Sequence, residues 1–175
     1  MTLTLSAKDV VYKRILPDQE IRTHVLDEHN RLWVGTNSGF IIINNGFSRP
    51  FAISPDTEQH SLNAVSHIMP SGKQALISTT SSLLLFDIET ETYEDITFDG
   101  QAIIVNASFL YREHAYFFSS FHNSLFDYSF SDGSLKVLKQ FEKDDGFEFR
   151  KICMAESIGL LLVDNEKGFF RADLY

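Results

Sequence analysis

Cysteine, basic charge and long apolar runs are all scarce in this sequence. Cys153 is the only cysteine of the 175 residues, so an intrachain disulfide is excluded and cysteine usage says nothing about the redox compartment. We interpret its thiol, within the strand-like segment 150–154, as a small buried group rather than a nucleophile. No apolar run approaches the roughly 18 residues that span a bilayer, so we expect no membrane contact by this segment.

Basic residues are outnumbered by acidic ones. The chain has 15 Lys and Arg against 24 Asp and Glu, which gives a formal net charge of −9. An acidic surface repels phosphate groups, and the basic residues form no stripe along the sequence. Nucleic acid is therefore excluded as an expected partner.

Aromatic residues, in contrast, are abundant and unevenly placed. The 16 Phe and 6 Tyr lie in short apolar runs that are bounded by Asn, Gly, Asp or Ser. Such runs are typical of β-strands separated by tight turns. The sequence therefore predicts an all-β protein.

One stretch, residues 27–39 followed by the apolar run 40–43, shows the repeating unit most clearly. It reads as a strand, a polar turn, a second strand, a glycine-closed turn and a third strand. Aligning Gly39 with Ser82 and with Gly168 gives offsets of 43 and 129 residues, the second three times the first. A period of about 40 to 45 residues with four short strands is typical of propeller blades.

The fold class that we predict is an all-β β-propeller or propeller fragment, with about four blades of four-stranded antiparallel sheets. Residues 1–175 form a single domain, and residues 1–17 supply a closing strand or hairpin, because residues 3–15 resemble residues 84–96 at an offset of 81. The blades are expected at roughly 18–58, 59–100, 101–146 and 147–175. The expected strands are 21–26, 32–36, 40–45, 49–54, 64–69, 74–79, 83–88, 92–97, 102–111, 115–121, 125–130, 135–141, 148–155, 159–164 and 168–174.

Each motif residue of the first unit has a structural explanation. Asn30 tolerates the positive φ of a short hairpin, and Trp33 is a wedge that fills the space between neighbouring sheets. Gly35 allows another backbone to approach closely, Thr36 hydrogen-bonds turn amides, and Gly39 takes a conformation that a side chain would strain.

These residues, together with Asp27 and Leu32, carry a family resemblance. The segment 27–46 closely resembles the repeat of the two-component regulator propeller family, whose blades carry an Asp, a turn with Gly or Asn, Leu-Trp, a small residue with Thr, and a Gly before the next strand. The family implies an extracytoplasmic sensor of a hybrid two-component system of the Bacteroidetes type that helps to detect glycan breakdown products. Its propellers usually have about seven blades, and its kinase, receiver and DNA-binding parts have no counterpart here.

The resemblance leads to the main functional expectation. We expect a non-catalytic sensor or recognition propeller, part of a two-component signalling receptor that detects glycan-type ligands such as an oligosaccharide. A sensor parent implies the periplasm; the N-terminal residues do not read as a secretion signal, so the cytoplasm is the expectation otherwise. One alternative is a protein–protein interaction scaffold that forms homo-oligomers through open blade edges. A propeller lyase or hydrolase is the third interpretation.

Chemical motifs are almost absent. The sequence has no zinc or metalloprotease spacing, no phosphate-binding loop, no dinucleotide-binding glycine pattern and no nucleophile elbow. We therefore expect no enzyme activity, no catalytic residue, no metal and no cofactor. A ligand site in a propeller is expected at the channel mouth, where the inner strands and the connections between blades meet. His24 and His67 occupy equivalent inner-strand places at an offset of 43. The candidate ligand-binding residues are Arg22, His24, Asn63, His67, Asn106 and Arg150.

Overall fold

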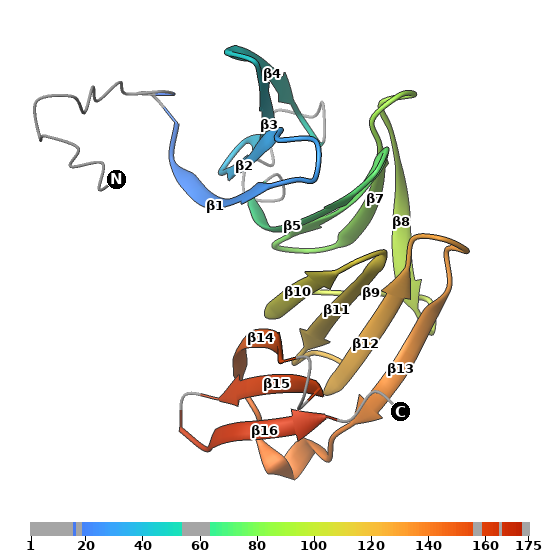
Figure 1. The fold of residues 1–175 in the computed structure, drawn as a ribbon. Coiled ribbons are helices and arrows are strands. Elements are labelled where there is room, and N and C mark those ends of the chain that lie inside the picture. Colours follow the sequence, from blue (N-terminus) through green and yellow to red (C-terminus); the bar gives the residue numbers. More distant parts are fainter. Residues whose placement is uncertain (1–15, 17–18, 54–63, 156–158, 165, 173–175) are drawn as a thin grey trace, which may run out of the picture.

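The computed structural model describes residues 16, 19–53, 64–155, 159–164 and 166–172. Within these ranges, four antiparallel sheets follow one another along the chain, and Figure 1 shows them arranged in an arc. The described residues contain no α-helix, only a 3-10 turn at Lys143–Asp145. The all-β, propeller-type fold expected from the sequence is confirmed.

Each sheet is a simple meander, so strands that are neighbours in the sequence are neighbours in the sheet. The first sheet contains β1 (Ile21–Leu26), β2 (Leu32–Thr36), β3 (Gly39–Asn44) and β4 (Phe47–Phe51). The second contains β5 (Val65–Ser71), β6 (Gln74–Thr79), β7 (Leu83–Asp87), β8 (Thr92–Phe98) and the short β9 (Gln101–Ala102). The third contains β10 (Ala107–Tyr111), β11 (His114–Ser119), β12 (Ser124–Ser129) and β13 (Leu135–Gln140). The fourth contains β14 (Phe149–Ala155), β15 (Gly159–Asp164) and β16 (Gly168–Ala172).

The expected strands agree with the observed ones to within a few residues, with one correction. The expected strand 102–111 is divided: β9 pairs with β8 of the second sheet, residues 103–106 are not in a strand, and β10 begins the third sheet. Ile103 and Val105 are instead buried in the core as part of the connection between the two sheets. The closing strand or hairpin expected at residues 1–17 lies outside the described residues, apart from residue 16.

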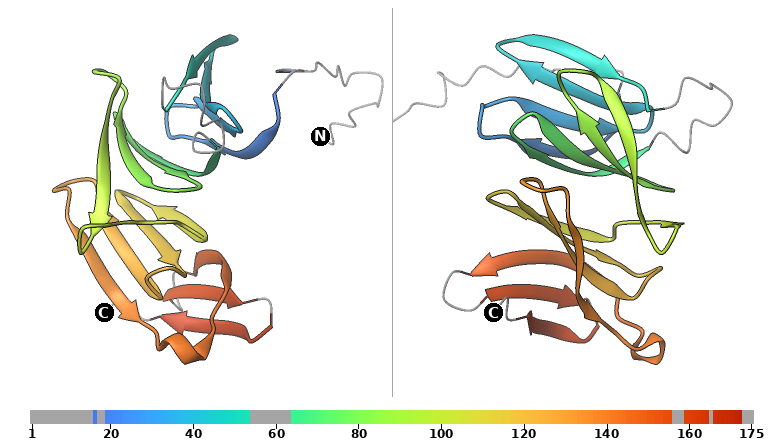
Figure 2. Two further views of the ribbon diagram at one scale, coloured as in Figure 1. Left: turned by 180° about the vertical axis from the view of Figure 1, so that it is seen from behind. Right: turned by 90° about the vertical axis from the view of Figure 1, so that its right-hand side faces the viewer.

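The first strand of each sheet lies on the concave side of the arc. Figure 1 shows β1, β5, β10 and β14 there, whereas β4, β8 and β13 lie on the outer side, and the views of Figure 2 agree. The turns that follow β1, β5 and β10 all contribute residues to one surface depression, namely Glu28, Gly72 and Arg112. The C-terminal ends of these inner strands therefore lie together on the same side of the molecule, which means that the strands run in the same direction.

The core consists of three apolar clusters, one between each pair of successive sheets. The middle strands contribute side chains to the clusters on both faces of their sheet. Leu76 belongs to the cluster shared with the third sheet and its neighbour Ile77 to the cluster shared with the first, and both are fully buried. Phe117 and Phe118 divide in the same way between the second and fourth sheets. This division follows from the alternation of side chains along a strand.

Trp33 is the largest side chain of the first cluster. Its ring is fully buried, stacks on Phe40 of its own sheet at 5.8 Å between centroids, and meets the edge of Phe86 of the second sheet at 6.4 Å. Aromatic pairs in such offset and edge-to-face arrangements add to the stabilisation that area burial provides. Trp33 thus lies between two neighbouring sheets, as a wedge would.

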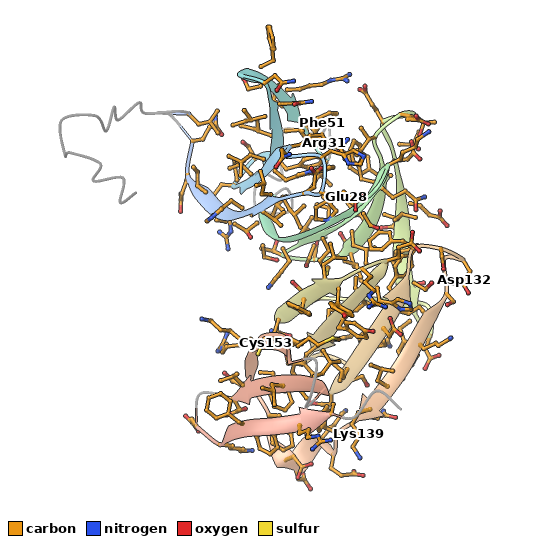
Figure 3. All side chains as sticks on the ribbon, in the orientation of Figure 1. Glu28, Arg31, Phe51, Asp132, Lys139 and Cys153 are labelled. Atoms are coloured by element: carbon orange, nitrogen blue, oxygen red, sulfur yellow. The ribbon has the colours of Figure 1, made fainter. Side chains whose placement is uncertain are left out.

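Asp27 organises the turn beside this cluster. Its carboxylate accepts hydrogen bonds from the backbone amides of His29 and Arg31, from Nε of Arg31 at 2.6 Å and from the indole Nε1–H of Trp33 at 2.8 Å. Arg31 also donates to the carbonyl of Gly72 in the second sheet, and Glu28 accepts from the amide of Gly72. The labelled Glu28 and Arg31 of Figure 3 therefore connect the first two sheets.

The turn between the second and third strands repeats in the first two sheets. The Thr36 hydroxyl accepts from the amide of Ser38 and donates to the carbonyl of Gly39, and the Thr79 hydroxyl accepts from the amide of Ser81. A Cβ on Gly35 would lie 3.0 Å from the carbonyl oxygen of Val65, so the glycine allows the second sheet to approach the first. Asn30 has a φ of 58°, and Gly39 has a φ of 129°.

Asp27→Ala is expected to lower the free energy of unfolding by about 3 kcal/mol, because it leaves the buried indole N–H of Trp33 without its acceptor and removes the carboxylate partner of Arg31. Chemical denaturation followed by the fluorescence of the single tryptophan measures the loss. Asp95→Ala, at an exposed site on β8, is the control and should change stability by less than about 0.5 kcal/mol. Equal effects of the two substitutions would contradict a structural role for the Asp27 network.

Candidate functional site

A groove of about 520 Å³ lies where the four inner strands meet. Every sheet contributes to it, although the four segments are far apart in the sequence. The groove is lined by Thr23, His24, Val25 and Leu26 of β1, by His67, Ile68 and Met69 of β5, by Ser108, Phe109 and Leu110 of β10, and by Arg150, Lys151 and Ile152 of β14. This is the region in which the sequence places a ligand site.

The lining changes from polar to apolar along every inner strand. Hydroxyl, imidazole or basic side chains come first, at Thr23, His67, Ser108 and Lys151, and aliphatic or aromatic side chains follow them. Because the strands run in the same direction, the polar positions lie toward one end of the groove and the apolar positions toward the other. The groove is therefore amphipathic along its length.

β-Bulges occur at the polar ends of three inner strands. The pairing of β1, β5 and β14 with the next strand shifts by one residue at Arg22, Ser66 and Arg150, each of which is an extra residue in its strand. A bulge bends the strand and re-aims the neighbouring side chains, and bulges are frequent next to functional sites. Here the residue after each bulge lines the groove.

His67 is the most enclosed ionisable residue of the groove. Its Nδ1 lies 3.1 Å from the Ser66 hydroxyl, and burial lowers the pKa of the imidazole to about 4. The ring is therefore neutral at pH 7, and its other nitrogen, Nε2, can meet a ligand as a donor or an acceptor, depending on the tautomer. A base with so low a pKa accepts protons poorly at neutral pH, which suits binding better than proton transfer.

Arg150 and Asn106 meet in a smaller pocket of about 90 Å³ next to the groove, together with Ser120 and Glu148. Arg150 lines both spaces, and its guanidinium donates to the exposed Glu148 carboxylate at 2.6 Å. The Asn106 side chain accepts from the amide of Ser120 at 2.7 Å, so it also holds the loop that follows β11.

The remaining candidates are dispersed. Arg22 is exposed on β1 and donates to the Asn37 side chain at 3.0 Å, and it does not line the groove. Asn63 lies outside the described residues. The structure thus brings His24, His67 and Arg150 together in one groove, places Asn106 beside it and leaves Arg22 apart from it.

The expected equivalence of His24 and His67 is wrong by one residue. Thr23 pairs with Gly35 and His67 pairs with Ser78, whereas His24 pairs with Val34 and Ile68 pairs with Ile77. Thr23 is therefore the counterpart of His67, and His24 is the counterpart of Ile68. Val25, next to His24, packs against the core shared with the second sheet, so the exposed His24 lies on the opposite face of its sheet.

Two further residues differ from expectation. Cys153 is exposed rather than buried, because its neighbour Ile152 takes the core-facing position of β14. Lys151 lines the groove beside the bulge at Arg150 but was not a candidate. The signal that could have found it is the pair of polar residues before the apolar residues of β1, β5 and β14.

No cluster of three or more His, Cys, Asp or Glu residues that could hold a metal ion occurs in the described part of the chain. Among the same residues, no helix has the length and apolar character needed to cross a membrane. The chemistry that the groove offers consists of hydrogen bonds, positive charge and apolar contact.

Comparisons with known proteins support the architecture. Neither protein families nor curated proteins give a match to the sequence. Solved structures give matches. One is a catalytically inactive variant of virginiamycin B lyase from Staphylococcus aureus, determined with quinupristin. It is similar with a TM-score of 0.69 and 12% identity, and the match covers 90% of this chain and 53% of the lyase.

Two proteins of Bacteroides thetaiotaomicron are also similar. One is the extracellular domain of a protein described as a hybrid two-component system, with a TM-score of 0.59 and 14% identity over 90% of this chain and 22% of that chain. The other is an auxiliary nutrient binding protein, with a TM-score of 0.59 and 16% identity over 82% of this chain and 36% of that chain. The chain therefore has a propeller-type fold and spans about half or less of these structures. Their identities are low enough that the likeness concerns the fold alone.

The depressed pKa of His67 predicts a pH dependence of stability. In the unfolded chain His67 has a pKa of about 6.5, whereas in the folded protein its pKa is about 4. The unfolded state therefore binds more protons between pH 6.5 and 4, and the stability of the folded state falls as the pH drops through this range. His67→Gln removes this contribution, worth up to roughly 3 kcal/mol at pH 4. The free energy of unfolding, measured from pH 7.5 to 4, should fall less in this variant than in the parent. His29→Gln, at an exposed turn, is the matched control and should follow the parent curve.

Proposed function

We propose that this chain is a non-catalytic recognition module of a sensor receptor, and that it binds a glycan-type ligand in the groove between its inner strands. One observation carries the proposal: thirteen residues from four separate sheets line a single open groove that is polar at one end and apolar at the other. Apolar walls with a few convergent polar groups are typical of ligand sites.

The lining of the groove favours binding over catalysis. The similar structures include an extracellular domain of a two-component system and a nutrient binding protein, but also a lyase, so the fold is compatible with either function. In the groove itself, His67 is a weak base at neutral pH, and the described lining contains no carboxylate that could act as a general acid or base. Detection of a glycan across a membrane would then belong to a longer parent receptor, to which this module contributes the binding surface.

Binding by this groove is testable with a panel of di- and trisaccharides, neutral and acidic, titrated by calorimetry and by NMR. We expect at least one of them to bind, and His67→Ala to weaken it by about five- to tenfold through the loss of a hydrogen bond. Lys139→Ala is the control, because Lys139 lies on the outer strand β13, away from the inner strand that carries Cys153 (Figure 3). Absence of binding across the panel at millimolar concentration, or equal loss in both variants, would contradict the proposal.

A second candidate function is a scaffold that self-associates through sheet edges. The observation that favours it is the exposure of two phenylalanines, Phe47 on β4 and Phe169 on β16, at 82% and 77%. β4 is an edge strand, and β16 has no further partner strand among the described residues. Unpaired strand edges beside exposed apolar side chains favour pairing with another copy.

Light scattering behind a sizing column, over a wide range of protein concentration, tests this candidate. We expect the average mass to rise with concentration and Phe169→Lys to shift the rise to at least about tenfold higher concentration, because a charge at the contact opposes association. Arg171→Lys keeps the charge of the same strand and serves as the control. A single monomeric mass at every concentration would rule out self-association.

A further inference from the structure

The groove differs in charge from the rest of this acidic chain. Its described lining contains two cationic side chains, Arg150 and Lys151, and the imidazoles of His24 and His67, but no Asp or Glu. The depression at the other end of the inner strands is different, because Glu28, Asp87 and Glu113 lie there beside Lys73 and Arg112. The absence of carboxylates is therefore a property of the groove and not of the whole concave side.

β14 supplies both cationic residues of the groove. Arg150 and Lys151 are consecutive residues at the bulge of this strand, and both line the groove. Glu148, the carboxylate that Arg150 contacts among the described residues, is exposed and lies in the adjoining pocket rather than in the groove.

The other end of the groove has a different character. Leu26, Phe109 and Leu110 follow the polar positions and are exposed or half-buried, whereas Ile68, Met69 and Ile152 are buried in the clusters between the sheets. A ligand that spans the groove therefore meets positive charge at one end and apolar surface at the other. Such a lining selects for charge and shape together.

We propose that the groove binds an organic anion, with the carboxylate of the ligand held by Arg150 and Lys151 and an apolar face of its body against the side chains that follow. The inference rests on the proposed function, since it names the ligand class of the same groove. The carboxylate of the ligand takes the place of Glu148 as the partner of the guanidinium, and bidentate contact with arginine is the strong form of such a bond. An acidic sugar and an aromatic carboxylate both carry this chemistry.

The experiment uses three probes on the full chain: cellobiouronic acid, cellobiose, which lacks only the carboxylate, and phenylacetate. We expect cellobiouronic acid to bind about tenfold or more tightly than cellobiose, and we expect its affinity to fall as salt is raised, because ions screen the exposed charges. Tighter binding of phenylacetate than of the acidic sugar would support the anion inference and contradict a glycan as the ligand.

Three variants locate the effect. Arg150→Gln keeps a polar side chain but removes the guanidinium charge, and it should weaken binding of cellobiouronic acid about tenfold, clearly more than it weakens binding of cellobiose. Glu148→Gln should have the opposite effect and tighten binding of cellobiouronic acid about two- to fivefold, because it removes the carboxylate that competes for Arg150. Lys139→Gln removes one positive charge at a distance from the groove and should change the affinity of neither probe.

The outcomes separate the two proposals. Equal affinity for cellobiouronic acid and cellobiose, without salt dependence, overturns the anion inference and leaves glycan recognition in place. If Lys139→Gln weakens binding of cellobiouronic acid as much as Arg150→Gln does, the anion inference is also overturned, because the effect would then come from net charge alone. Failure of all three probes to bind overturns the anion inference, and the proposed function is then decided by the neutral members of the saccharide panel.

Discussion

Burial of both faces of the middle strands is the constraint on which this structure depends. Leu76 and Ile77 are neighbours in β6, both are fully buried, and they point to opposite sides of the same sheet. A sheet with two apolar faces is stable in water only when another sheet covers each of them. Stacking of twisted sheets in sequence produces an arc, and the first strands of the sheets converge on its concave side (Figure 2). The groove is thus a geometric result of how the core is covered.

The strands could be predicted because their signals are local. Short apolar runs that end in Asn, Gly, Asp or Ser mark β2, β3, β6 and β7, and the period of the repeat marks the sheets. The groove was predicted only in part: His67 and Arg150 were candidates, whereas Lys151 and Ser108 were not. Lys151 follows a bulge, which has no characteristic sequence, and Ser108 lies in an evenly paired strand. The error in aligning His24 with His67 comes from the hairpin turns, because residues 27–31 connect the paired Leu26 and Leu32, whereas the shorter segment 71–74 connects the paired Pro70 and Ala75.

The strongest motif of the sequence turned out to serve the fold. Asp27 connects Arg31 and Trp33 within the first sheet, where burial alone would raise the pKa of its carboxyl group, but hydrogen bonds from Trp33 and Arg31 outweigh burial and lower it. The fourth sheet reaches a comparable result with other residues, since Asp164 accepts backbone amides of Glu148, Glu166 and Lys167. A carboxylate that gathers turn amides can therefore persist where the tryptophan is lost, which explains why the repeats diverge in sequence while keeping one architecture.

The bulges at the start of β1, β5 and β14 separate two kinds of position within a few residues. Ile68 and Ile152, which follow the polar residues of β5 and β14, pack in the core. Polar residues from three of the four sheets, together with Ser108 of the third, lie at one end of the groove. The residues that line the groove can therefore be exchanged while the core between the sheets is kept, and new selectivity would arise from a few substitutions per repeat. Evolution by duplication and local drift, and protein engineering by grafting, would both act on the same short segments.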